Sequence, residues 1–116
     1  MNYIKLLFSN NTILRILQKN EFRKYKLSGK CIEFGANHKI QRNFLSKDSK
    51  RCKVFYSNID KKNNSFIKIN LIKKLIHKKK YKNIIIFNVL EHLSDVNIAL
   101  KNLNLLLDSK GKILGS

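Results

Sequence analysis

The sequence contains no proline and only four glycines. Collagen-like, proline-rich linker and repeat architectures are therefore excluded. Cysteine is also scarce, since Cys31 and Cys52 lack the Cys-x-x-Cys spacing and the three histidines are scattered. The residues thus predict neither a disulfide framework nor a structural zinc site, and a reducing, cytoplasmic setting fits best.

No long hydrophobic run is present near the N-terminus. The apolar stretch there is broken by Lys5 and by the polar residues 9–12, too early for a signal-peptide core or a membrane span. Apolar residues at helical spacing predict one helix or two short ones over residues 3–25, covering a core. A helix lying on a membrane surface is the alternative, although polar residues interrupt its apolar face.

Acidic residues are few: 7 Asp and Glu stand against 25 Lys and Arg, a formal net charge of +18. With 43% hydrophobic residues in 116, the chain still has enough apolar side chains to form one core. The charge makes a nucleic-acid-binding module the alternative function. The densest basic patch contains Lys73, Lys74, Lys78–Lys80 and Lys82. Against this alternative, aromatic residues are not interleaved with the charge and arginine, the usual base reader, is scarce.

Apolar runs alternate with helical patterns along the rest of the chain. The unbroken run Ile84–Ile86 predicts a strand buried on both faces, which needs helices on either side. Ser94 is the expected N-cap of a helix that continues to Leu107 and ends at residues 108–111. Further strands are expected at 31–32, 53–57, 66–69 and 112–116, and further helices at 38–46 and 71–80. The predicted class is α/β, with a mostly parallel sheet and flanking helices.

Ligands of parallel sheets bind at the carboxyl ends of strands, near a change in strand order. The residues directly after the expected strands are therefore candidates for a site. They are residues 33–38, 58–60, 70 and 88–92.

Four stretches, taken in order and spacing, resemble the class I S-adenosylmethionine-dependent methyltransferases of the small-molecule, methyltransferase type 11-like kind. The first looks like the family's first strand and glycine-rich loop, and the second like its second strand with a terminal acid. The third, which contains Val89-Leu90-Glu91-His92, is the most specific, and the fourth resembles the helix, turn and fifth strand. These stretches are residues 27–35, 56–60, 81–93 and 99–115.

The resemblance implies a Rossmann-like domain over residues 27–116, preceded by a helical segment at 1–26. The family continues past its fifth strand, so the fold implied here is an incomplete methyltransferase fold. Its fifth strand would form an exposed sheet edge, to which a second copy or a partner chain could pair. An active enzyme, a fragment and a degenerate, non-catalytic domain all remain open.

The resemblance also implies S-adenosylmethionine as the cofactor. Gly35 would allow close backbone approach to its methionine moiety, and Asp60 would accept hydrogen bonds from both ribose hydroxyls. Glu33 would face the ligand's ammonium group, or it would only order the loop.

Three amides complete the implied cofactor site. Asn37 stands where the family has a glycine, and we expect it to adopt a left-handed conformation. Asn70 would accept a hydrogen bond from the adenine amine. Asn88 lies just beyond the fourth strand, where the methyl group would be delivered.

Glu91 and His92 are the candidate catalytic residues. His92 could act as a general base, because its ordinary pKa lies near neutrality. The alternative is that either residue only caps or orients the following helix. A metal is not expected, because Asn88 replaces the acid that a hard cation would need. The acceptor implied is a small molecule or a glycan or lipid precursor; an RNA methyltransferase would combine the two functional hypotheses.

Overall fold

The computed structural model describes residues 13–45, 51–59 and 66–115. They form a mixed α/β fold in which four strands make one all-parallel sheet. The strands are β1 (Gly29–Phe34), β2 (Cys52–Ser57), β3 (Tyr81–Ile86) and β4 (Leu107–Gly115). The helices are α2 (Ile13–Phe22) and α3 (Val96–Leu106), and two single 3₁₀ turns are η1 (Ile40–Arg42) and η2 (Leu90–His92). The predicted α/β class and parallel sheet are confirmed.

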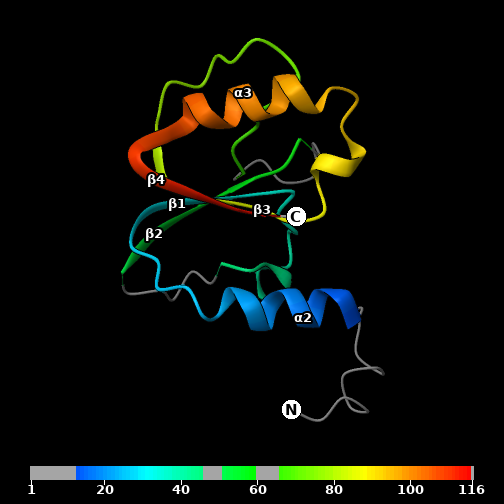
Figure 1. Cartoon of the computed structure of the whole chain (residues 1–116), viewed down its shortest axis with the longest axis vertical. Coiled ribbons are helices and arrows are strands. Elements are labelled where there is room, and N and C mark those ends of the chain that lie inside the picture. The colour runs from blue at the N-terminus through cyan, green and yellow to red at the C-terminus, as the bar shows by residue number, and fades with distance from the viewer. Residues whose placement is uncertain (1–12, 46–50, 60–65, 116) are drawn as a thin grey trace.

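The sheet lies between the two helices, with α3 over one face and α2 over the other (Figure 1). Ile84 and Ile86 pack in the core on the side of α3, with Leu103 and Leu106, whereas Ile85 packs in the core of the opposite face. All three isoleucines are at most 1% exposed. A strand buried on both faces was the prediction for this run, and it is confirmed.

The strand order is β2-β1-β3-β4. The chain therefore reverses its direction of travel across the sheet between β1 and β3, which lie side by side although β2 intervenes in the sequence. The expected strand at 66–69 is reduced to one parallel bridge between Ser57 and Ile67. Backbone hydrogen bonds from Asn58 N to Ile67 O (3.2 Å) and from Ile67 N to Tyr56 O (2.9 Å) hold this segment beside β2.

The helix predicted at 71–80 does not form. The buried side chain of Asn102, on α3, donates hydrogen bonds from Nδ2 to the carbonyl oxygens of Leu71 (2.6 Å) and Lys73 (2.9 Å). In a helix these oxygens would accept hydrogen bonds from backbone N–H groups of the same segment. Here the side chain of Asn102 donates to them in place of those N–H groups. The helix predicted at 38–46 is likewise reduced to η1.

The boundaries of α3 and β4 also differ from the prediction. Asp95, not Ser94, is the N-cap of α3, since its Oδ1 accepts a hydrogen bond from Ile98 N at 3.1 Å. β4 begins directly at Leu107, five residues before the predicted start. Its register with β3 steps from Tyr81↔Leu107 to Asn83↔Lys112, so residues 108–111 form a bulge where a turn before the strand was expected.

Candidate functional site

A hollow of about 90 Å³ lies at the carboxyl ends of the strands. We call it the strand-end hollow. Two of the predicted cofactor residues, Gly35 and Asn70, line it. The other lining residues are Phe34, Ser57, Asn58, Ile59, Ile69, Leu71, Val89 and Leu93. Residues that follow β1, β2 and β3 thus meet where the sheet changes its strand order, the position at which parallel sheets bind ligands.

Gly35 follows β1 with a φ of 66°. An added Cβ would lie 2.5 Å from Cγ2 of Val89, so both the backbone conformation and the space require glycine. The sequence predicted that Gly35 allows another group to approach its backbone closely. In the structure that group is the side chain of Val89. Contact with a ligand at Gly35 stays a prediction.

Glu33 is 3% exposed and is used by the protein itself. Its Oε2 accepts a hydrogen bond from Phe44 N (3.1 Å) and its Oε1 accepts one from Leu45 N (2.7 Å). The carboxylate therefore holds the segment after η1 against the end of β1. Of its two predicted roles, ordering the loop is the one that these contacts fulfil.

Asn37 does not adopt the expected left-handed conformation. Among the described non-glycine residues, only Asn88 has a positive φ. The side chain of Asn43 instead satisfies both backbone groups of Asn37: its Oδ1 accepts from Asn37 N (2.6 Å) and its Nδ2 donates to Asn37 O (2.8 Å). Asn37 Oδ1 accepts in turn from Lys39 N at 2.9 Å. Side-chain hydrogen bonds shape this loop, so a left-handed residue is not needed.

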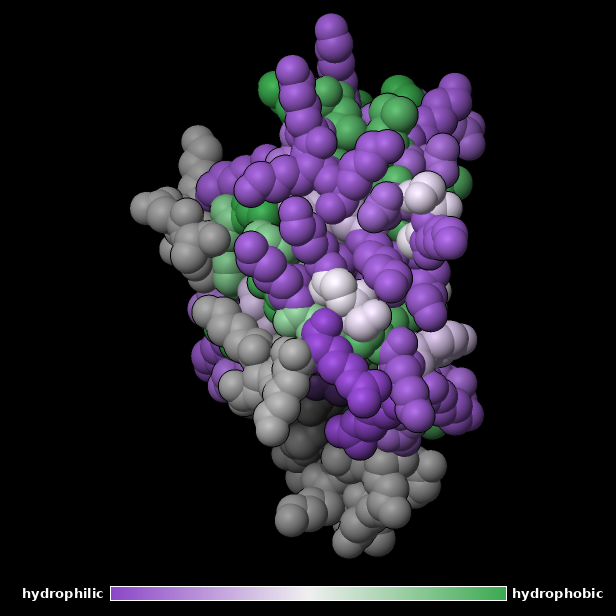
Figure 2. Space-filling view, turned by 90° about the vertical axis from the view of Figure 1, so that its left-hand side faces the viewer, coloured by the Kyte–Doolittle hydropathy of each residue, from purple (hydrophilic) through white to green (hydrophobic). Residues whose placement is uncertain are grey.

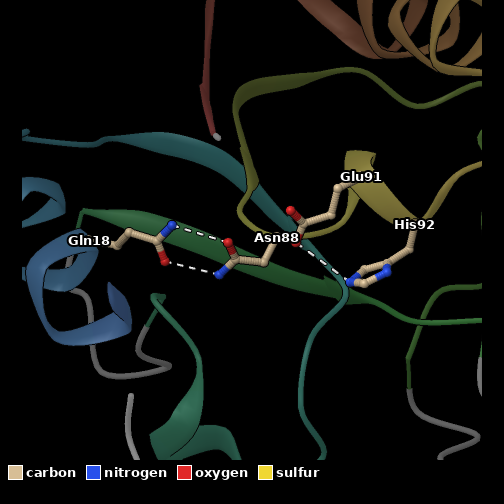
Figure 3. A network of polar contacts seen from close by, with 4 residues as sticks. All are labelled: Gln18, Asn88, Glu91 and His92. Atoms are coloured by element: carbon tan, nitrogen blue, oxygen red, sulfur yellow. Dashed lines mark hydrogen bonds and ion pairs between the residues drawn. The ribbon is translucent and has the colours of Figure 1, made fainter. Parts of the chain in front are cut away.

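Asn88 follows β3 with a φ of 58° and faces helix α2. Its Nδ2 donates to Gln18 Oε1 at 3.0 Å, and its Oδ1 accepts from Gln18 Nε2 at 3.2 Å (Figure 3). The two amides therefore form a reciprocal pair that joins α2 to the end of β3. Each atom of the Asn88 amide keeps a second donor or acceptor position, and contact of this amide with a cofactor stays a prediction.

Glu91 and His92 lie together on η2 (Figure 3). His92 Nε2 is 3.6 Å from Glu91 Oε1, and the side chains are 77% and 63% exposed, respectively. Neither residue lines the strand-end hollow. A solvated pair of this kind contributes little to stability. A catalytic role for either residue stays a prediction.

The remaining predicted cofactor residues are Asn70 and Asp60. Asn70 is exposed at the rim, and its Oδ1 accepts a hydrogen bond from Ile72 N at 3.1 Å. This bond makes a local turn and occupies one of the two lone pairs of the oxygen that was expected to accept from adenine. Asp60 lies outside the described residues, and its predicted role stays a prediction.

Sequence reasoning missed Asn43 and the contact that Asn58 makes. Asn58 was among the residues marked as following a strand, but its actual contact, Nδ2 to Ala36 O at 2.7 Å, joins the loops after β1 and β2. Asn43 carried no signal, because it falls within a segment predicted to be helical. Cys31, on β1, is fully buried, and burial raises the pKa of its thiol to about 12.

Within the described ranges, no group of three or more His, Cys, Asp or Glu side chains is placed to hold a metal ion. No helix in that part of the chain has the length and apolar character needed to cross a bilayer. Comparison with known proteins finds no matching family model, curated protein or solved structure.

Proposed function

We propose that this chain is an S-adenosylmethionine-binding domain of the methyltransferase type. The observation that carries the proposal is the strand-end hollow, placed where the strand order reverses between β1 and β3 and lined by Gly35. Doubly wound nucleotide-binding folds place the ligand at this point. Its volume of about 90 Å³ is below the roughly 300–1,000 Å³ of a complete ligand pocket. The hollow would therefore hold one moiety of the cofactor, with the remainder along the open edge.

The topology supports the proposal further. If the segment bridged at Ile67 counts as a strand beside β2, the strands stand in the order 3-2-1-4-5 along the sheet. This is the order of the doubly wound Rossmann-like fold over its first five strands. The four stretches of resemblance fall on β1, β2, β3 with η2, and α3 with β4, respectively.

Methyl transfer depends chiefly on in-line positioning of the acceptor and the sulfonium. The exposed Glu91–His92 pair does not supply a positioned base, so we place the function in cofactor binding and positioning. The acceptor is then a small molecule whose own nucleophile needs little help from the protein.

Calorimetric titration with S-adenosylmethionine and S-adenosylhomocysteine tests the proposal. We expect saturable binding of both by the full chain, with dissociation constants of about 1–100 μM, or about 5.5–8 kcal/mol. Asp60→Ala should weaken binding about tenfold or more, because it removes an acceptor for the ribose hydroxyls, worth about 1.5–3 kcal/mol. Glu91→Gln is the matched control and should bind as the wild type does. A folded chain that binds neither compound contradicts the proposal.

A further inference from the structure

A second hollow lies along the segment that leads from Ile67 to β3. Its volume is about 190 Å³, and we call it the lysine groove. Three exposed lysines line it together with apolar side chains, an amide and an imidazole. The lining residues are Lys68, Ile69, Asn70, Lys73, Lys74, Leu75, Ile76 and His77.

The lysine groove is built on a fixed backbone. Asn102, which is 7% exposed, binds the carbonyl oxygens of Leu71 and Lys73 as described above. Ile69 and Leu71 are buried in the core beneath. In the predicted helix, Lys68 would have preceded the first turn, apart from Lys73 and Lys74. The non-helical path instead brings Lys68, Lys73 and Lys74 to one hollow.

The stretch of sequence that contains the groove carries charge of one sign. Residues 61–90 include nine lysines and no acidic residue. Hydrophilic side chains cover most of the face shown in Figure 2, with apolar residues exposed among them near the end where α3 lies. A run of lysines without acidic residues attracts phosphate groups, which lysine binds as a point charge.

The groove also offers surfaces that suit a base. Ile76 is 86% exposed. The ring of His77 stacks on Tyr81 with a centroid distance of 5.7 Å and an interplanar angle of 7°, and its Nε2 lies 2.8 Å from Tyr81 Oη. Burial, and then the nearby charge of Lys79, lower the pKa of His77. The contact with Tyr81 therefore orients the ring, and the lowered pKa favours its neutral form, which suits stacking against a nucleobase.

From these observations we propose that the lysine groove binds single-stranded RNA, with Lys68, Lys73 and Lys74 on consecutive phosphates and Ile76 and His77 against a base. A single strand can present one unstacked base to a hollow of this kind, whereas duplex RNA is recognised by its shape across wide minor grooves. Ile69 and Asn70 line both hollows, but the three lysines lie outside the strand-end hollow, so RNA binding can be tested without the cofactor.

Fluorescence anisotropy with a labelled oligouridylate of about ten nucleotides tests the proposal, over a range of about 50–200 mM KCl. The groove variant is Lys68→Gln, Lys73→Gln, Lys74→Gln. The control variant, Lys26→Gln, Lys30→Gln, Lys110→Gln, removes the same charge from exposed positions elsewhere.

We expect the groove variant to bind about tenfold or more weakly, and its slope of log affinity against log salt to be smaller by about 2, from about 0.7 per lost phosphate contact. The control should lose less than about threefold, because only the general field is reduced. Equal losses in the two variants would overturn the proposal, since the net charge would then explain the binding.

A second measurement separates a nucleotide from a bare phosphate chain. Ile76→Ser should weaken RNA binding about threefold or more, and should leave the binding of inorganic polyphosphate unchanged, because polyphosphate has no base to contact Ile76. If the substitution leaves RNA binding unchanged, the groove is a general anion site and the nucleotide assignment is wrong.

Discussion

Polar residues near the strand ends serve mainly the protein's own backbone. Glu33 binds two backbone N–H groups, Asn43 binds both backbone groups of Asn37, and Asn88 pairs with Gln18. Buried polar groups need such partners, because leaving them without hydrogen bonds costs about 1–3 kcal/mol each. Residue type and position after a strand therefore do not distinguish side chains that stabilise loops from side chains that bind a ligand.

The substitution Glu33→Gln distinguishes a role in stabilising the loop from a role in binding the cofactor. We expect the free energy of unfolding to fall by about 1–3 kcal/mol, because an amide offers only one acceptor oxygen to Phe44 N and Leu45 N and lacks the charge that strengthens both bonds. Urea unfolding measures the change, with the exposed Glu91→Gln as a control expected within about 0.5 kcal/mol of the wild type. Unchanged stability together with lost S-adenosylmethionine binding would instead assign Glu33 to the cofactor.

At the level of elements, the residue at which α3 begins depends on a single hydrogen bond. Ser94 and Asp95 are both good N-cap residues and stand side by side. The structure uses Asp95, whose extended backbone directs its carboxylate to Ile98 N. Two neighbouring residues with similar N-cap propensity cannot be ranked from the sequence, because the choice depends on the backbone conformation between η2 and α3.

The two candidates for the cap can be compared directly. Asp95→Ala should lower the free energy of unfolding by about 0.5–2 kcal/mol, since it removes the acceptor for Ile98 N and a negative charge at the start of α3. Ser94→Ala, one residue earlier, should change it by less than about 0.5 kcal/mol. Thermal or urea unfolding gives both values, and the reverse ranking would contradict the assigned cap.

Across the whole molecule, the formal net charge of +18 opposes compaction. The described lysine–carboxylate pair of Lys24 and Glu21 is highly exposed, at 69% and 68%, so it offsets little of that repulsion. Burial of apolar residues on both faces of the sheet must therefore stabilise the fold against its own charge.

Stability should consequently rise with salt. We expect the urea midpoint to increase as NaCl is raised from about 20 to about 300 mM, because the screening length falls below the spacing of many surface lysines. The Lys26→Gln, Lys30→Gln, Lys110→Gln variant should show a smaller increase. A midpoint that is independent of salt would mean that repulsion among these charges does not limit stability.

The parts of the fold that were predicted correctly depend on local patterns. The run at Ile84–Ile86 marked β3 because unbroken β-branched residues suit a strand covered on both faces. β2 and α3 also matched within a few residues. The predicted helix at 71–80 was wrong. The carbonyl oxygens of Leu71 and Lys73 bond to Asn102, which lies on α3, after β3 in the chain, so no local pattern indicates the contact.

The order of residues determined the α/β class, the buried strands and the basic character, since each depends on neighbours in the chain. The site depended on contacts between distant residues: Gln18 meets Asn88 across 70 positions, and Asn102 sets the path of the lysine groove. No local pattern encodes these pairings, because they exist only once the helices have packed against the sheet. The tertiary structure therefore selected which polar side chains support loops and which cations gather at one groove.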